Sequence, residues 1–263
     1  MSVTAAQGFR AAGVAAGLKS TGANDVALVV NDGPLAAAAG VFTRNRVKAA
    51  PVLWSQQVLT AGVVRAVALN SGGANACTGS DGFLDTHRTA EHVAALLEIG
   101  AGDVAVCSTG LIGVRLPTDR LFAGLDAAHA SLSDDGGDAA AAAIMTTDSV
   151  RKTAVASREG WTVGGIAKGA GMLAPSLATM LVVVTTDAVA DAATLDSALR
   201  AATRVSFDRV GGDDDEHRRQ RGSEHPRALR HAAHGESLAG GDRGLRHGVG
   251  GHDRGRRSQS GGG

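Results

Sequence analysis

The sequence predicts an α/β fold, an α+β layered sandwich, because short apolar runs alternate with longer segments rich in alanine and leucine as far as about residue 210. The 263 residues are 44% apolar with no formal net charge, which is typical of a globular protein with a buried core. No apolar run approaches the roughly 18 residues that a membrane span needs. The chain lacks the excess of basic residues that would indicate nucleic-acid binding, so we expect a small-molecule partner.

Four short apolar runs bounded by turn residues are expected to form buried strands. These runs are Val26 to Val30, Ala66 to Leu69, Val104 to Cys107 and Met180 to Val184.

Three segments between or after these runs carry helix signals. Pro51 suits the first turn of a helix through Trp54, because its missing N–H costs nothing there. Asp81 is expected to cap a second helix that Gly100 ends. Asp191 is expected to cap a third helix with one buried apolar face. That face is made of Leu195, Leu199 and Ala202.

The composition changes abruptly after Val210. Residues 211–263 hold ten Arg, six His and fourteen Gly, with no Ile, Met, Phe or Trp. We expect this tail to be disordered, because it cannot bury enough apolar surface to offset chain entropy. It is either a natural basic tail or, as we favour, the product of out-of-frame translation of GC-rich codons.

Cysteine and histidine usage indicates neither a disulfide framework nor a metal site. Residues 1–10 lack a charged start followed by an apolar stretch, so we expect a cytoplasmic protein without a secretory signal. Cys77 and Cys107 form no CxxC knuckle, and as thiol nucleophiles they lack a neighbouring histidine. The histidines on helix-like segments lack metal-ligand spacing. They are His87, His92 and His129.

A segment rich in glycine and small residues leads into the last predicted strand. Residues 168–181 read KGAGMLAPSLATML and place Thr179 at the start of that strand. A main-chain cut before Thr179 would create an N-terminal threonine, which supplies both a hydroxyl nucleophile and its own amine as base. Taken alone, however, the segment is better explained by turn geometry.

Two further clusters follow predicted strands. In the turn at residues 107–113, the Thr109 hydroxyl and the Gly110 N–H are suited to stabilise a developing oxyanion, although an ordinary strand exit is the simpler explanation. The segment at residues 70–79 lacks the lysine and the spacing of a phosphate-binding loop, so we expect a turn that lines a pocket.

Together these motifs resemble the ornithine acetyltransferase family (glutamate N-acetyltransferase, ArgJ) over residues 8–210. Several motifs in the right order are more specific than any one, so the resemblance outweighs the simpler explanations. They are GFRAAG at 8–13, GVFTRN at 40–45, NSGGANA at 70–76, STG at 108–110, TTD at 146–148 and the segment at 168–181.

The resemblance implies a self-processing acetyltransferase. The chain would cut itself between Ala178 and Thr179 through an N-to-O acyl shift. Thr179 would then take acetyl from N-acetylornithine and pass it to glutamate in arginine biosynthesis. Thr109 and Gly110 would stabilise the oxyanion, and Thr147, Lys168 and Thr179 would contact substrate. Some members also use acetyl-CoA, which this sequence does not decide; no other cofactor is implied.

The resemblance also implies an architecture. The family has the layered sandwich of a self-processing aminopeptidase family, and its mature form is a heterotetramer of two α and two β chains. Residues 1–178 would form the α-chain-like domain, 179–210 the start of the β chain with its nucleophile, and 211–263 the tail.

The chain departs from the family pattern after Val210. The family continues with an acidic stretch, a Ser-Thr-Asn-Asp-Thr type motif and a long second half, whereas residues 211–220 read GGDDDEHRRQ. We hypothesise a frameshift near residue 211. The fold would then be incomplete, and we expect inefficient processing and catalysis. The alternatives are a self-processing aminopeptidase and an inactive truncated fragment.

Overall fold

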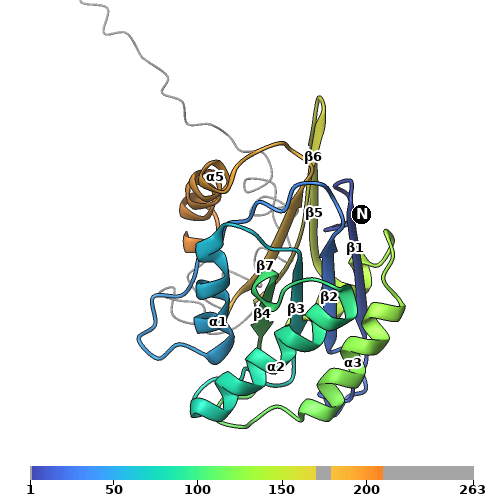
Figure 1. Cartoon of the computed structure of the whole chain (residues 1–263), viewed down its shortest axis with the longest axis vertical. Coiled ribbons are helices and arrows are strands. Elements are labelled where there is room, and N and C mark those ends of the chain that lie inside the picture. The colour runs from blue at the N-terminus through green and yellow to red at the C-terminus, as the bar shows by residue number, and fades with distance from the viewer. Residues whose placement is uncertain (1, 170–178, 210–263) are drawn as a thin grey trace, which may run out of the picture.

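The computed structural model describes residues 2–169 and 179–209, which form two sheets and the helices that cover them (Figure 1). The first sheet has the order β1-β2-β3-β4, with antiparallel pairs except for the parallel pair β3 and β4. Its strands are β1 Phe9–Val14, β2 Val26–Asn31, β3 Ala66–Asn70 and β4 Val104–Ser108. The second sheet is antiparallel with the order β5-β6-β7. Its strands are β5 Lys152–Arg158, β6 Trp161–Lys168 and β7 Leu181–Thr186.

Five α-helices are described in these residues. They are α1 Ala50–Val58, α2 Gly79–Leu97, α3 Thr118–Ala130, α4 Gly137–Ala143 and α5 Ala192–Val205. Helix α2 makes the crossover between β3 and β4 and lies with α3 over one face of the four-stranded sheet (Figure 1). No helix among these residues is long and apolar enough to cross a membrane.

The predicted helix ends are partly correct. Pro51 lies in the first turn of α1, and the Asp191 side chain caps α5 by accepting from the Thr194 N–H at 2.7 Å. The predicted ends of α2 were wrong. Its N-cap is Thr78, which leaves Asp81 inside the first turn. It ends at Leu97, and its C-cap is Glu98 in the left-handed conformation, φ 56°, before the chain reaches Gly100.

Alternating residues of β2 separate two apolar layers. Val26, Leu28 and Val30 pack with apolar side chains of α1, α2 and α3. Ala27 and Val29 face the opposite layer, which contains alanines of α4 and Ile166 of β6. Each large side chain buried in this way contributes roughly 1.5–3 kcal/mol.

The second layer joins the two sheets and includes the N-terminal segment. Val3 is fully buried there, and its carbonyl accepts a hydrogen bond from the Thr185 hydroxyl at 2.6 Å. A Cβ on Gly164 would lie 2.0 Å from the carbonyl oxygen of Ser2, so β6 needs glycine where this segment crosses it. The segment thus ties β6 and β7 to the rest of the fold.

The four predicted strands are all present: β2, β3 and β4 each run one residue further than predicted, and β7 begins one residue later and ends two residues later. Sequence patterns missed β1, β5, β6, α3 and α4. Thr179 precedes β7, which pairs with β6. The predicted boundary between the α-chain-like domain and the β chain, at residues 178 and 179, therefore lies between two neighbouring strands of one sheet. The predicted disordered tail, 211–263, lies outside the described residues.

Candidate active site

Two of the motif segments meet at the carboxyl ends of the parallel strands β3 and β4. The Ser108 hydroxyl donates to the Asn70 side-chain oxygen at 2.6 Å, and the Thr109 N–H donates to the Asn70 carbonyl at 3.0 Å. The Leu111 N–H donates to the Gly72 carbonyl at 3.2 Å. The carboxyl edge of parallel strands is where α/β folds commonly bind ligands. The segment at residues 70–79 therefore supports the turn that carries Thr109.

Gly110 allows these two turns to approach. Its φ of 128° strongly disfavours a side chain, and a Cβ there would lie 2.5 Å from the carbonyl carbon of Gly72. Only glycine fits this position without moving the backbone of the neighbouring turn. The glycine predicted beside Thr109 thus has a clear structural requirement.

Lys168 joins the β3–β4 edge to the second sheet. Its side chain is 5% exposed, and its ammonium donates to the Thr146 hydroxyl at 2.6 Å and to the Thr109 hydroxyl at 3.3 Å. Since Thr109 Oγ1 accepts from Lys168, its own proton can be donated to a third group. The Thr109 N–H already donates to the Asn70 carbonyl, so the hydroxyl is the donor that Thr109 can offer to an oxyanion.

Asp148 lies behind Lys168 in a buried polar cluster. It accepts from the Gly169 N–H at 2.8 Å, from the Thr146 N–H at 3.2 Å and from the Lys152 ammonium in a short hydrogen bond. Burial opposes ionisation of Asp148, but these hydrogen bonds outweigh it and lower the pKa of the carboxyl. Asp148 is therefore an anion at neutral pH, and its charge stabilises the nearby lysines.

Thr147 and Thr179 are both exposed. Thr147 lies between Thr146 and Asp148. Thr179 comes two residues before Leu181, which pairs with Lys168 across β6 and β7. Ala178, the predicted residue before the cut, lies outside the described residues.

The cysteines have no part in this cluster. Both are free thiols, and burial raises the pKa of the Cys107 thiol to about 12. Cys107 is consequently protonated at neutral pH and a poor nucleophile. Within residues 2–169 and 179–209, no three His, Cys, Asp or Glu side chains gather into a group that could hold a metal ion.

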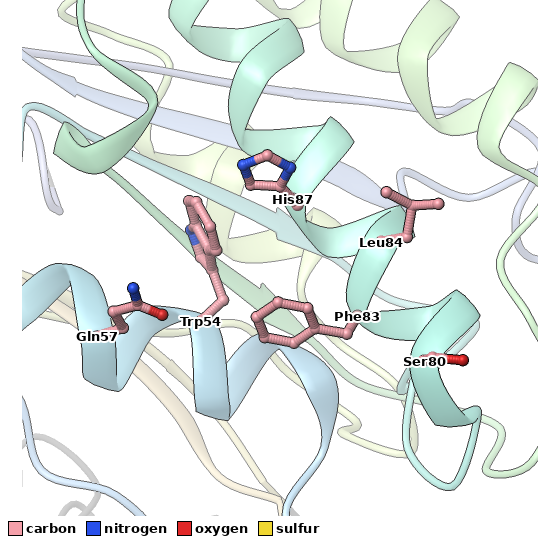
Figure 2. A pocket seen from close by; sticks show the side chains of 6 residues that line it. All are labelled: Trp54, Gln57, Ser80, Phe83, Leu84 and His87. Atoms are coloured by element: carbon pink, nitrogen blue, oxygen red, sulfur yellow. The ribbon is translucent and has the colours of Figure 1, made fainter.

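A separate shallow hollow lies between α1 and α2 (Figure 2). Trp54 is fixed in it by a hydrogen bond from its indole N–H to the Val104 carbonyl, 2.9 Å, and by edge contacts with Phe83 and His87. None of the predicted site residues lines this hollow. We interpret it as part of the packing between the two helices.

A family model described as "ArgJ family" matches residues 10–217. The chain belongs to the ArgJ family. The match continues past Val210, so the family pattern extends beyond the boundary expected from the sequence.

Curated relatives support the same assignment. The arginine biosynthesis bifunctional protein ArgJ of Streptomyces coelicolor is 68% identical over 213 residues, which are 81% of this chain and 56% of the relative. The protein of the same name from Mycobacterium tuberculosis H37Rv is 65% identical over 221 residues, which are 80% of this chain and 54% of the relative. The chain spans about half the length of these relatives.

Solved structures of the family confirm the mixed α/β fold. An ornithine acetyltransferase from M. tuberculosis, complexed with ornithine, superposes with a TM-score of 0.66 at 66% identity. The match covers 67% of this chain and 96% of that one. An ArgJ protein from Bacillus halodurans superposes with a TM-score of 0.55 at 31% identity, covering 72% of this chain and 91% of that one.

The structure shows which site residues sequence reasoning overlooked. Thr146 and Asp148 were noted only as part of a motif, and Lys152 was not singled out at all. The available signal was the spacing of four residues between Asp148 and Lys152 in a chain with few lysines. That signal is weak, because most such pairs lie on exposed surfaces.

Proposed function

We propose that this ArgJ-family chain is the front part of an ornithine acetyltransferase, which transfers acetyl from N-acetylornithine to glutamate in arginine biosynthesis. The observation that carries the proposal is the contact between Lys168 and Thr109 beside the start of β7. It brings an amino-acid-binding cation and an oxyanion donor to the strand that Thr179 precedes. The names of the curated relatives and the ornithine complex of the M. tuberculosis protein agree with this activity.

The first chemical step is the release of Thr179. Its hydroxyl attacks the carbonyl of Ala178, and the peptide bond becomes an ester through an N-to-O shift. Water then hydrolyses the ester, which leaves the Ala178 carboxylate and the free amine of Thr179. This amine can act as the base for the next step.

The second step is a ping-pong transfer. The Thr179 hydroxyl attacks the acetyl carbonyl of N-acetylornithine, and its proton passes through the Thr179 amine to the departing ornithine. The tetrahedral oxyanion accepts hydrogen bonds from the Thr109 hydroxyl and the Gly110 N–H. The amine of glutamate then attacks acetyl-Thr179, which forms N-acetylglutamate and restores the hydroxyl.

Lys168 and Thr147 serve substrate binding in this proposal. Lys168 is buried beside Thr109 and hydrogen-bonded to two hydroxyl groups. A charged ammonium held there can attract the carboxylate that both amino-acid substrates carry. Thr147 follows Thr146 directly and is exposed, so its hydroxyl is accessible to the same substrate.

Coverage of the M. tuberculosis proteins supports the proposed cleavage. The present chain covers 96% of the crystallised M. tuberculosis chain but only 54% of the curated M. tuberculosis relative. The crystallised chain is therefore much shorter than the whole relative, as expected for one product of a cut. A heterotetramer of two α and two β chains and a cytoplasmic location remain predictions from the family resemblance, which leaves the use of acetyl-CoA open.

The test of this function supplies the part that the relatives have and this chain lacks. Residues 1–210 of this chain are joined to the portion of the S. coelicolor relative that follows the equivalent position. Intact mass should show a cut before Thr179, and N-acetylornithine plus glutamate should give ornithine and N-acetylglutamate. Thr179→Ala should abolish both, whereas Thr179→Ser should retain cleavage.

Two results would overturn the proposal. Release of amino acids from peptides without acetyl transfer would assign an aminopeptidase. An uncut, inactive hybrid would leave only a folded fragment. Resequencing the codons for residues 207–220 tests the frameshift separately: a corrected frame should encode the Ser-Thr motif, and an unchanged read defeats that hypothesis.

A further inference from the structure

A buried ion pair holds both backbone polar groups of one residue in the candidate site. The Asp148 carboxylate accepts from the Gly169 N–H at 2.8 Å, and the Lys152 ammonium donates to the Gly169 carbonyl at 3.1 Å. The same ammonium donates to Asp148 Oδ1, which closes the ring of contacts. The Asp148 side chain is fully buried and that of Lys152 is 6% exposed, so solvent competes little with these bonds.

The position of Gly169 gives this arrangement its importance. Gly169 directly follows Lys168, the last residue of β6, and begins the segment that leads to Thr179. Fixing both its N–H and its carbonyl sets the direction in which the chain leaves the strand. The backbone of Lys168 is then fixed on both sides, by β6 before it and by the held glycine after it.

Asp148 also lies close enough to attract Lys168 itself. The Lys168 ammonium is 4.0 Å from Asp148 Oδ2, compared with 2.6 Å from the Thr146 hydroxyl and 3.3 Å from the Thr109 hydroxyl. Lys152 and the Gly169 N–H occupy Oδ1, and the Thr146 N–H reaches Oδ2 at 3.2 Å. With these donors in place, Lys168 hydrogen-bonds to the two threonines.

We propose that Asp148 and Lys152 are positioning residues of the acetyl-transfer site, which hold the Lys168 ammonium against Thr109 by fixing Gly169 and occupying the shared carboxylate. The proposal rests on the function proposed above. Neither residue contacts the reacting atoms. Without the Lys152 ammonium, Lys168 moves toward Asp148 and away from Thr109, and the substrate carboxylate loses its partner.

The first experiment needs no catalysis and uses the 263-residue chain. Amide hydrogen exchange at Gly169 is measured in the unchanged chain and in Lys152→Met and Asp148→Ala. Both variants should exchange at Gly169 on the order of 10-fold faster than the unchanged chain, because the hold on this residue is lost. Arg200→Met is the matched control, since Arg200 and Asp196 form an i, i+4 pair that is exposed. Unchanged exchange at Gly169 in both site variants would overturn the proposal.

The second experiment measures kinetics in the hybrid described above. Lys152→Met should raise KM for N-acetylornithine on the order of 10- to 100-fold per cleaved site, with a smaller fall in kcat, because a shifted Lys168 weakens substrate positioning. Lys152→Arg should recover part of the loss, and Arg200→Met should change neither constant. A role in folding alone would lower the yield of cleaved protein and leave KM per site unchanged, which would contradict positioning.

The kinetic constants of a double variant show whether Asp148 and Lys152 act as one linked pair or independently. Asp148→Asn combined with Lys152→Met should cost much less than the product of the two single losses, because both changes disable the same arrangement. Fully multiplicative losses would overturn the proposal. If the hybrid transfers no acetyl group, the proposed function fails, whereas the exchange experiment still decides whether the pair holds Gly169.

Discussion

The two sheets of this protein differ in how completely they are packed. Both faces of the four-stranded sheet carry large buried clusters: one with α1, α2 and α3, and one with α4 and Ile166. The three-stranded sheet contributes Ile166 to the shared layer, but among residues 2–169 and 179–209 its outer face carries only two small clusters. On β7, Val184 is 37% exposed.

The two sheets also contribute differently to the candidate site. The well-packed sheet provides the rigid edge that carries Asn70, Ser108 and Thr109. The less covered sheet provides Lys168 at the end of β6, and its strand β7 begins two residues after Thr179. Since the chain spans about half the length of its relatives, we expect the portion that they have in addition to cover this second sheet.

Leu28→Ala compared with Val182→Ala should give the largest contrast. Leu28 is fully buried in the layer under the helices, so its truncation should lower the free energy of unfolding by about 2–5 kcal/mol. Val182 is only partly buried on the outer face of the second sheet, and its truncation should cost less than about 1 kcal/mol. Urea unfolding of the 263-residue chain measures both. Equal losses would contradict the difference between the sheets.

Gly110→Ala should have the next largest effect. The left-handed φ and the 2.5 Å approach to Gly72 should together cost about 1–3 kcal/mol and displace Thr109. Thermal unfolding measures the loss, and the uncut fraction of the hybrid reports the effect on the site. Gly113→Ala is a useful control, because its φ is also positive, 83°, but its Cβ would meet no atom within 4 Å. The contact with Gly72 matters only if Gly110→Ala costs more.

The smallest of the three expected effects is on how the free energy of unfolding depends on acid pH. The folded-state pKa of Asp148 is lowered, so its contribution is fully present above the unfolded value of about 3.9 and is lost as pH falls through the folded pKa. Asp148→Asn should therefore flatten the fall in stability below about pH 4. Urea unfolding from pH 7 to pH 2 checks this, with Asp196→Asn as the exposed comparison. Parallel curves for the unchanged chain and Asp148→Asn would refute the assignment.

Local sequence was sufficient where a single residue decides the geometry. Pro51 and Asp191 correctly located the starts of two helices, because a missing N–H and a capping carboxylate act within one turn. Asp81 misled for the same reason: an acidic residue suits the first turn as well as the cap. Strands β5 and β6 were missed because glycine and charged residues interrupt their apolar pattern, and pairing across the hairpin outweighs that local weakness.

The sequence by itself determined the family, the order of the motifs and the position of Thr179 ahead of a strand, because these depend on residues that are neighbours in the chain. Only the tertiary structure decided that Lys168 meets Thr109, 59 residues away, and that Asp148 and Lys152 hold Gly169. The physical reason is that these contacts arise where the end of β6 lies against the β3–β4 edge. The layer that joins the two sheets depends on residues from Val3 to Ile166.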